Sequence, residues 1–567
     1  MKLRRAVIFA GAVTAAAGVW LFWNRPQRAD MAEYVPAESL AYLEVNDLQS
    51  IADGIANTTA WRTLAGPANA RLNVGGSRWL GTLAKWTGIG TTESVVLARS
   101  QFAATLLELD SSDAGTALQV NLLAALVIET HTSEFRMRPV LERRIEEFAR
   151  QKYGQPRLEH KVVDGVDYAE WIAPEGNRRI VSAFVGTVAY VGSDEEPVRA
   201  CISVHRGARP SLASNRLLNK IRDRADAPLF GFASGSGLKS FVIATAPYVF
   251  GPAATRTNAP QLFATAASNL VDGIAWTSHF IDGQVEDRYV MTLTSGMAQQ
   301  LRDGLVPDHL PTLRSAELLP GSTYSFTQYS FRDSATAWSD LNGAISSHVD
   351  FVTAVTVPRA LASLLDSYGI DDPKGFLSVV GPEIATARLD DNSSRAILIA
   401  NVLDGPAIRK LIHHRLGPGA TSERFGDAEV DASTDSERGA ASFVGNNLLM
   451  GSRDEIIRCL QAIAQSNTLA GNESFQRAQR LTNPSVRPTS ITLTNDEHAA
   501  RSFVLILSAD RTAALSSNLA ALSDGSKRLP YAVTVTQLGE NGFERTARSS
   551  FGLSGTLLVL FASGESP

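Results

Sequence analysis

The longest run of apolar residues lies near the N-terminus. Residues 6–23 read AVIFAGAVTAAAGVWLFW and contain no charged side chain. A helix of this length spans about 27 Å, close to the thickness of the hydrocarbon core of a bilayer. Lys2, Arg4 and Arg5 precede the run. Because cytoplasmic flanks carry the excess of Lys and Arg, we expect a signal-anchor transmembrane helix at the inner (cytoplasmic) membrane, with the bulk of the chain in the periplasm.

A cleaved signal peptide is the competing interpretation of the same run. Residues 15–17 are three alanines and would suit a signal peptidase. Cleavage there would leave the apolar residues 18–23 as the new N-terminus. The sequence therefore favours an uncleaved anchor, and whether the segment is cleaved stays open.

Beyond residue 30, short apolar strands and amphipathic helices follow one another twice in the same order. Each half has a strand, a short helix with a Trp, a long hydrophobic strand, an amphipathic helix, a β-meander and a capped helix. In the first amphipathic helix, Met137, Leu141, Ile145 and Phe148 share one face. The main expected ranges are 41–45, 122–129 and 135–153 in the first half and 324–329 and 395–403 in the second.

Several short motifs recur about 260 residues further along the chain, which indicates an internal repeat. The recurring pairs are Phe184-Val185-Gly186 with Phe443-Val444-Gly445, Gly192-Ser193 with Gly451-Ser452, and Arg199 with Arg458. Ser193 and Ser452 each start a Ser-x-x-Glu pattern typical of a capping box, so we expect both to be helix N-caps. The spacing is larger early in the chain, which predicts extra loop residues in the first half near 110–117.

These patterns together predict an α+β fold. We expect an N-terminal transmembrane helix followed by two similar lobes of largely antiparallel sheet with packed helices. The predicted divisions are 1–30 for the signal-anchor helix and linker, 31–315 for the first repeat lobe and 316–567 for the second. Duplicated lobes usually leave a groove between them, so we expect a partner site there.

Composition narrows the class of protein. The 567 residues carry a net charge of −5, and 44% of them are hydrophobic. This excludes a disordered chain and a polytopic membrane protein, and the lack of a strongly basic region argues against a nucleic-acid partner. The two cysteines, Cys201 and Cys459, fall at matching places in the two halves. We expect two buried, unpaired thiols.

Candidate catalytic and metal-binding patterns are incomplete. Ser236 and Lys239 form a Ser-x-x-Lys pair without its companion motifs. His413 and His414 are adjacent, so on a helix they point about 100° apart and cannot readily share a metal. We predict no catalytic, metal-binding or cofactor-binding residue and no cofactor. Two further clusters have structural interpretations: Asp390-Asp391-Asn392 as a turn, and Arg136, Arg138, Arg143 and Arg144, interleaved with glutamates, as a solvated helix face.

Four motifs stand out in the first half: AYLEVNDL (41–48), VDGVDY (163–168), VAYVGSDEE (188–196) and SLASN (211–215). In this order they resemble a bacterial family of unknown function with a duplicated domain, whose members look like membrane-anchored envelope proteins. The resemblance covers most of residues 33–300 and, more faintly, 316–560. The second half departs from it at residues 324–327. The resemblance implies no catalytic residue for this chain.

Two functions remain from the sequence. The first is a single-pass, non-enzymatic envelope component that binds a partner protein, a lipid or the cell wall, with the membrane as a further partner through the N-terminal helix. The second is an extracytoplasmic hydrolase with a dispersed active site. The absence of a nucleophile–base pair or metal constellation in the sequence favours the first.

Overall fold

The computed structural model describes residues 28–67, 96–97, 99–113, 118–221, 226–250, 259–366, 368–391, 396–482, 487–507 and 519–556. The transmembrane helix expected at residues 6–23 lies outside this set. Within the set, no helix combines the length and the apolar character needed to cross a bilayer.

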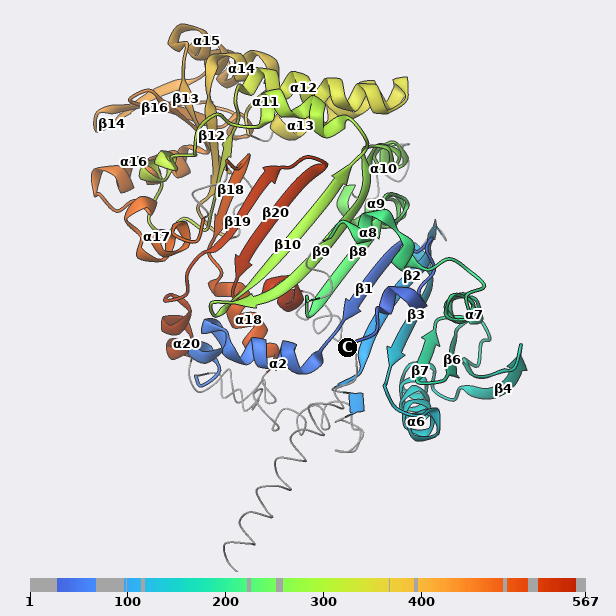
Figure 1. Cartoon of the computed structure of the whole chain (residues 1–567). Helices are drawn as coiled ribbons and strands as arrows, with labels where there is room; N and C mark the ends of the chain where they lie inside the picture. The colour runs from blue at the N-terminus through green and yellow to red at the C-terminus, as the bar shows by residue number, and fades with distance from the viewer. Residues whose placement is uncertain are drawn as a thin grey trace, which may run out of the picture.

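Every described strand belongs to one 20-stranded sheet, in which all pairings are antiparallel (Figure 1). The first half contributes β1 (Ala41–Val45), β2 (Gln101–Asp113), β3 (Leu118–Glu129), β4 (Arg157–Val163), β5 (Val166–Ile172), β6 (Arg179–Val185), β7 (Val188–Gly192), β8 (Leu229–Ser234), β9 (Val271–Ile281) and β10 (Gln284–Leu293). The second half contributes β11 (Ser325–Ser330), β12 (Val380–Arg388), β13 (Ile397–Val402), β14 (Thr421–Phe425), β15 (Ala428–Ala432), β16 (Ala440–Val444), β17 (Asn447–Gly451), β18 (Ser490–Thr494), β19 (Ala532–Leu538) and β20 (Gly542–Ser549).

The two halves pair their strands in the same order. From its outer edge inward, the first half runs β4-β5-β6-β7-β3-β2-β1-β8-β9-β10. The second half runs β14-β15-β16-β17-β13-β12-β11-β18-β19-β20. Isolated bridges also correspond, with Pro36 opposite Ser211 and Pro320 opposite Thr468. This correspondence supports the repeat inferred from the recurring motifs.

The two-lobe arrangement in the predicted fold class is wrong. Strands β10 and β20 pair with each other from Val285 opposite Ser549 to Thr292 opposite Gly542, so the halves share one sheet instead of forming two lobes. The described residues also contain no membrane-spanning helix. The physical reason for the single sheet is that β10 and β20 would each end their half as an edge strand with unpaired backbone groups, and pairing satisfies both edges. We call the β10–β20 pairing the seam.

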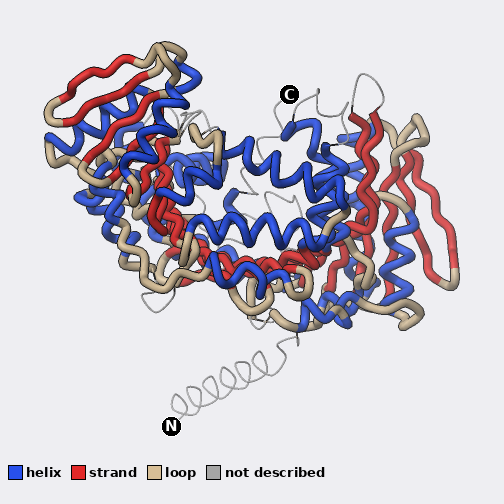
Figure 2. The backbone as a smooth tube through the Cα atoms, turned by 90° about the horizontal axis from the view of Figure 1, so that it is seen from above, coloured by secondary structure: helices blue, strands red, loops and turns tan. Residues whose placement is uncertain are grey.

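One face of the sheet carries most of the helices. Figure 2 shows the sheet curving around them, so that they fill its concave side. Buried clusters identify the contacts: α6 (Glu134–Tyr153) packs on Phe184, α11 (Met297–Leu305) and α12 (Ser334–His348) pack near Leu293, and α3 (Thr59–Leu64) packs with α18 (Glu497–Leu507), α20 (Leu519–Ser526) and Phe551. The remaining longer helices are α2 (Leu48–Asn57), α9 (Gly235–Phe250), α10 (Ala259–Leu270), α13 (Phe351–Asp366), α14 (Pro373–Val379) and α15 (Gly405–Leu416).

The opposite face is covered at two places only within the described residues. In the first half, α7 (Glu195–His205) packs on β3, β6 and β7, and η1 (Met31–Tyr34), η2 (Leu212–Ser214) and α8 (Arg216–Asn219) complete the cover on the same face. In the second half, α16 (Arg453–Ala464) packs on β15, β16 and β17, and η4 (Arg314–Leu318), η6 (Leu469–Gly471) and α17 (Glu473–Gln479) complete the cover on the same face. Between these two groups, no described helix passes in front of β9, β10, β20 and β19 in Figure 1.

Two local expectations need correction. On α6, Met137 and Leu141 are buried as expected, but Phe148 is 49% exposed and Ala149 takes its place in the core. Residues 110–113, expected in a loop, belong to strand β2, which extends to Asp113 and pairs with β3 from Leu118; residues 114–117 lie outside the described set.

The two predicted capping boxes differ. Ser452 forms a complete box with Glu455 at the start of α16. In the first half, α7 begins one residue later and is capped by Asp194, whose carboxylate accepts a hydrogen bond from the Glu195 N–H. A helix capped at Ser193 would place Pro197 where its N–H should bond the Ser193 carbonyl, and proline has no N–H to donate.

Candidate functional site

The structure does not assemble the catalytic pattern that the sequence contains. Ser236 and Lys239 both lie exposed in the first turns of α9. The Ser236 hydroxyl lies 2.9 Å from the Ser234 hydroxyl. No hydrogen bond joins Ser236 to Lys239 among the described contacts, so Lys239 is not placed as its base.

The other polar motifs have structural partners. His413 and His414 are exposed in the last turn of α15. Asp390 forms a two-point ion pair with Arg458, at 2.7 and 3.2 Å, which favours the structural interpretation of its turn; Asn392 lies outside the described residues. Arg138 on α6 pairs with Glu134, Glu142 and Asp167. In the described part of the chain, no three His, Cys, Asp or Glu side chains are placed to hold a metal ion.

Both cysteines are buried and unpaired, as expected. Burial raises the pKa of each thiol to about 12. The thiolate is the reactive form, so neither residue is set up as a nucleophile.

Two adjoining hollows lie over the seam on the open face of the sheet. The larger encloses about 500 Å³, and its described lining comes from α8, β8, β9, β10, β20 and the β19–β20 turn. The smaller encloses about 200 Å³ over β10, β20 and β19. Both include Arg288 and Glu544 in their lining. We call the two hollows together the groove.

Strand register places side chains of the groove in rows that cross the seam. Residues directly opposite one another in adjacent strands project from the same face. One row contains His279, Glu286, Arg548 and Val533, and another contains Ala275, Val290, Glu544 and Gln537. Arg288 and Thr546 face each other between these rows.

Glu286 forms the most constrained polar contact of the groove. Its side chain is only 3% exposed. One carboxylate oxygen accepts from Nε of Arg288 at 2.9 Å and the other from Nε of Arg548 at 2.7 Å. Arg288 remains 48% exposed and Arg548 29% exposed. Glu286 and Arg548 lie on different halves of the chain, so this contact ties the halves together across the seam.

Glu544 has a different environment. It is exposed, and Nε2 of Gln537 donates to it at 2.7 Å. The residue opposite it across the seam is Val290. No arginine or lysine forms an ion pair with Glu544 in the part of the chain that the structure describes.

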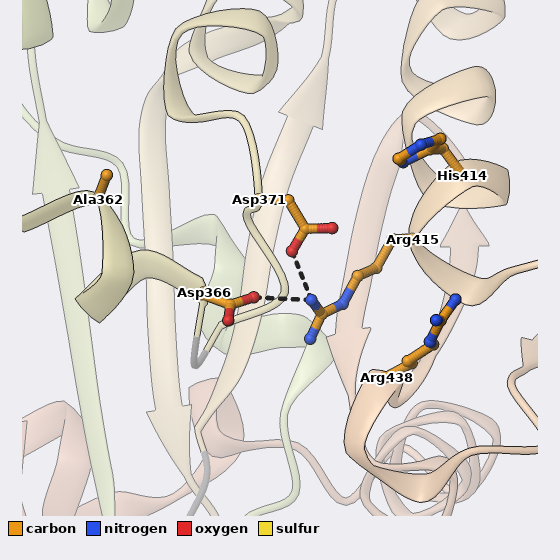
Figure 3. Close-up of a pocket in the computed structure, with 6 residues that line it drawn as sticks. All are labelled: Ala362, Asp366, Asp371, His414, Arg415 and Arg438. Carbon is orange, nitrogen blue, oxygen red and sulfur yellow. Dashed lines mark hydrogen bonds and ion pairs between the residues drawn. The ribbon is translucent and has the colours of Figure 1, made fainter. Parts of the chain in front are cut away.

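A third hollow, of about 500 Å³, lies in the second half between α13 and α15 (Figure 3). Nη1 of Arg415 pairs with Asp366 at 2.7 Å and also with Asp371. The hydrogen bond from Asp371 lowers the pKa of Asp366, whereas burial raises the pKa of Asp371. His414 and Arg438 line the hollow but do not reach the two carboxyl groups in Figure 3.

The residues of the groove were not singled out from the sequence. A weak signal exists: each strand that follows the turns at Asp282-Gly283 and Asn541-Gly542 carries charged residues an even number of positions apart, which project from one face of the sheet. These are Glu286 and Arg288 on β10, and Glu544 and Arg548 on β20. Charged residues on one face of a strand predict that this face is solvated, but they do not reveal that the two strands are neighbours.

No protein-family model, no curated protein and no solved structure matches this chain.

Proposed function

We propose that this protein is a non-enzymatic binding component of the bacterial cell envelope, and that it engages its partner through the groove over the seam. The observation that carries the proposal is the open face of β9, β10, β20 and β19, which is hollowed and carries exposed charged side chains. The resemblance of the sequence motifs to membrane-anchored envelope proteins supports the same class.

The chemistry of the groove supports binding over catalysis. Its lining mixes apolar side chains such as Phe232 and Val290 with the charged Arg288 and Glu544. Apolar area with a few polar groups that fix orientation is typical of a recognition site. None of the described groove residues forms a serine–base, cysteine–base or metal constellation.

Photocrosslinking in cells tests this proposal. A photoreactive amino acid is placed in the groove at Val535 or Thr546, and as a control at Leu158, which is exposed on the sheet-edge strand β4. We expect a discrete adduct from both groove positions and none from the control. Adducts of equal yield from all three positions, or from none, would contradict a partner site in the groove.

A hydrolase centred on Asp366 and Asp371 is the second candidate. The opposite pKa directions of two neighbouring carboxyl groups resemble an acid–base pair. However, Arg415 pairs with both carboxyl groups, and this favours a structural tie between α13 and α15. An Asp371→Asn protein that folds but loses its cellular role, beside a fully active Asp390→Asn control, would favour the hydrolase.

The proposed location is the inner membrane, with the bulk of the chain in the periplasm. Its basis is the charge pattern of residues 2–28 in the sequence. Alkaline phosphatase fused after residue 567 should be active, because that enzyme folds only outside the cytoplasm. A fusion active only with a cytoplasmic reporter would contradict the location.

A further inference from the structure

We propose that Glu544 anchors a cationic side chain, arginine or lysine, of a polypeptide partner lying in the groove. The inference rests on the proposed function and specifies the chemistry of its partner.

The internal repeat supplies a template for this site. The strand pairings relate β10 to β20 by a pseudo-twofold axis that passes between Arg288 and Thr546. This axis makes Glu286 equivalent to Glu544, and Arg548 equivalent to Val290. At the first position Glu286 faces Arg548 across the seam and pairs with it at 2.7 Å. At the second position Glu544 faces Val290. A valine therefore stands at the position equivalent to Arg548.

The larger hollow lies where the missing arginine would be. Val290, Ala275 and Glu544 all line it. The row through Glu544 carries Val290 and Ala275, whereas the equivalent row through Glu286 carries the larger Arg548 and Val533. The smaller side chains leave space beside an exposed carboxylate.

The charges of the groove favour a cation at this end. Glu286 is already paired with two arginines, Arg288 and Arg548. Glu544 accepts only the neutral Gln537 amide in the described contacts, and Glu540 lies nearby in the same lining. Lys220, the residue after α8, and Arg288 also line the hollow, whereas Glu540 and Glu544 lie at its β19–β20 end, so we place the cation on the β20 side. A guanidinium meets the carboxylate best, because it can donate two parallel hydrogen bonds.

The lining around the Glu544 carboxylate is apolar, and this favours a polypeptide as the partner. Phe232, Ala275, Val290 and Ile221 surround the hollow. A basic residue flanked by apolar side chains satisfies both features, whereas a bare metal ion would leave the apolar lining unused.

The experiment titrates the full protein with two peptides by calorimetry and fluorescence. The probe is acetyl-Val-Arg-Val-amide, and the control is the same peptide with citrulline, which has nearly the shape of arginine but no charge. We expect the arginine peptide to bind with millimolar or tighter affinity and the citrulline peptide to bind about tenfold more weakly, as for the loss of a charge-assisted contact. Glu544→Gln should weaken arginine binding to the citrulline level.

A second variant tests the template directly. Val290→Arg places an arginine opposite Glu544, in the register that Arg548 has with Glu286. It should abolish binding of the arginine peptide while leaving the thermal midpoint equal to the wild type or higher, which shows that the protein is folded. Unchanged binding in this variant would overturn the proposal.

The remaining outcomes separate this inference from the proposed function. Equal binding of the two peptides, or no binding of either up to millimolar concentration, overturns the cation site. If groove crosslinks persist in that case, the proposed function stands with a different partner chemistry. If the crosslinks are absent as well, both fail.

Discussion

Ser193 and Ser452 occupy matching positions beside β7 and β17 but form different hydrogen bonds. The Ser452 hydroxyl caps α16. The Ser193 hydroxyl instead donates to the Leu122 carbonyl at 2.8 Å and accepts from the Ala124 N–H at 3.1 Å, which ties it to β3. Pro197 accounts for the difference, since it shifts the start of α7 and transfers the cap to Asp194.

The cap residues give a residue-scale prediction. Ser452→Ala and Asp194→Ala should each lower the free energy of unfolding by about 1 kcal/mol, since each removes a side-chain acceptor from a helix N-terminus. The double variant should be near-additive, because the two helices lie in different halves of the sheet. Urea denaturation followed by circular dichroism measures this. An Asp194→Ala variant as stable as the wild type would contradict the assignment of the cap.

The cysteines give a second prediction at this scale. Burial raises the pKa of Cys201 and of Cys459 to about 12, so at pH 8 only about one thiol in 10⁴ is ionised. A chromogenic thiol reagent should therefore react with neither residue in the folded protein and with both in urea. Rapid reaction of one thiol under native conditions would show that its helix opens locally.

At the scale of elements, the seam depends on a carboxylate that both halves share. Glu286 on β10 is buried and accepts from Arg548 on β20, whereas its pseudo-equivalent Glu544 is exposed. The same residue type at two related positions therefore contributes differently to the pairing of the two strands.

Glu286→Gln tests the stability of the seam. The substitution keeps the shape but removes the charge that two arginines share, so we expect a loss of about 1–2 kcal/mol, reduced by the partial exposure of both arginines. Glu544→Gln is the matched control and should change the free energy of unfolding by less than about 0.5 kcal/mol. Equal effects of the two variants in urea denaturation would contradict the structural role of Glu286.

At the scale of the whole molecule, the two halves share one sheet. Each half alone would therefore end in an unpaired edge strand at the seam. Separation would expose β10 and β20 as edge strands and would divide the cluster in which Trp61 and Leu64 pack on Phe503 and Phe551. The halves also meet where α11 packs on α12.

Division of the chain between residues 309 and 310 tests this dependence. We expect the two fragments to self-associate or aggregate when made singly, because exposed edge strands pair with other chains. Produced together, they should form a 1:1 complex in size-exclusion chromatography. Two monomeric, stably folded fragments would support the independent lobes that the sequence patterns suggested.

Local patterns determined much of the fold in advance. Runs of apolar residues placed strands β1, β3, β11 and β13 within a few residues of their observed bounds, because strands of the core bury apolar side chains. Recurring motifs predicted a similar order of elements in the two halves, and the two halves pair their strands in the same order. The sequence also lacked a complete catalytic set, and Ser236 and Lys239 are not joined in the structure.

Only the tertiary structure decided how the halves meet. The pairing of β10 with β20 uses backbone groups, which every residue type carries, so no side-chain pattern announces it. The contact between Glu286 and Arg548 joins residues far apart in the chain. The hollow beside Glu544 exists because the small side chains of Val290 and Ala275 lie in the same row as Glu544 across three strands. The register of these strands is set by their pairing, and neither sequence segment determines it alone.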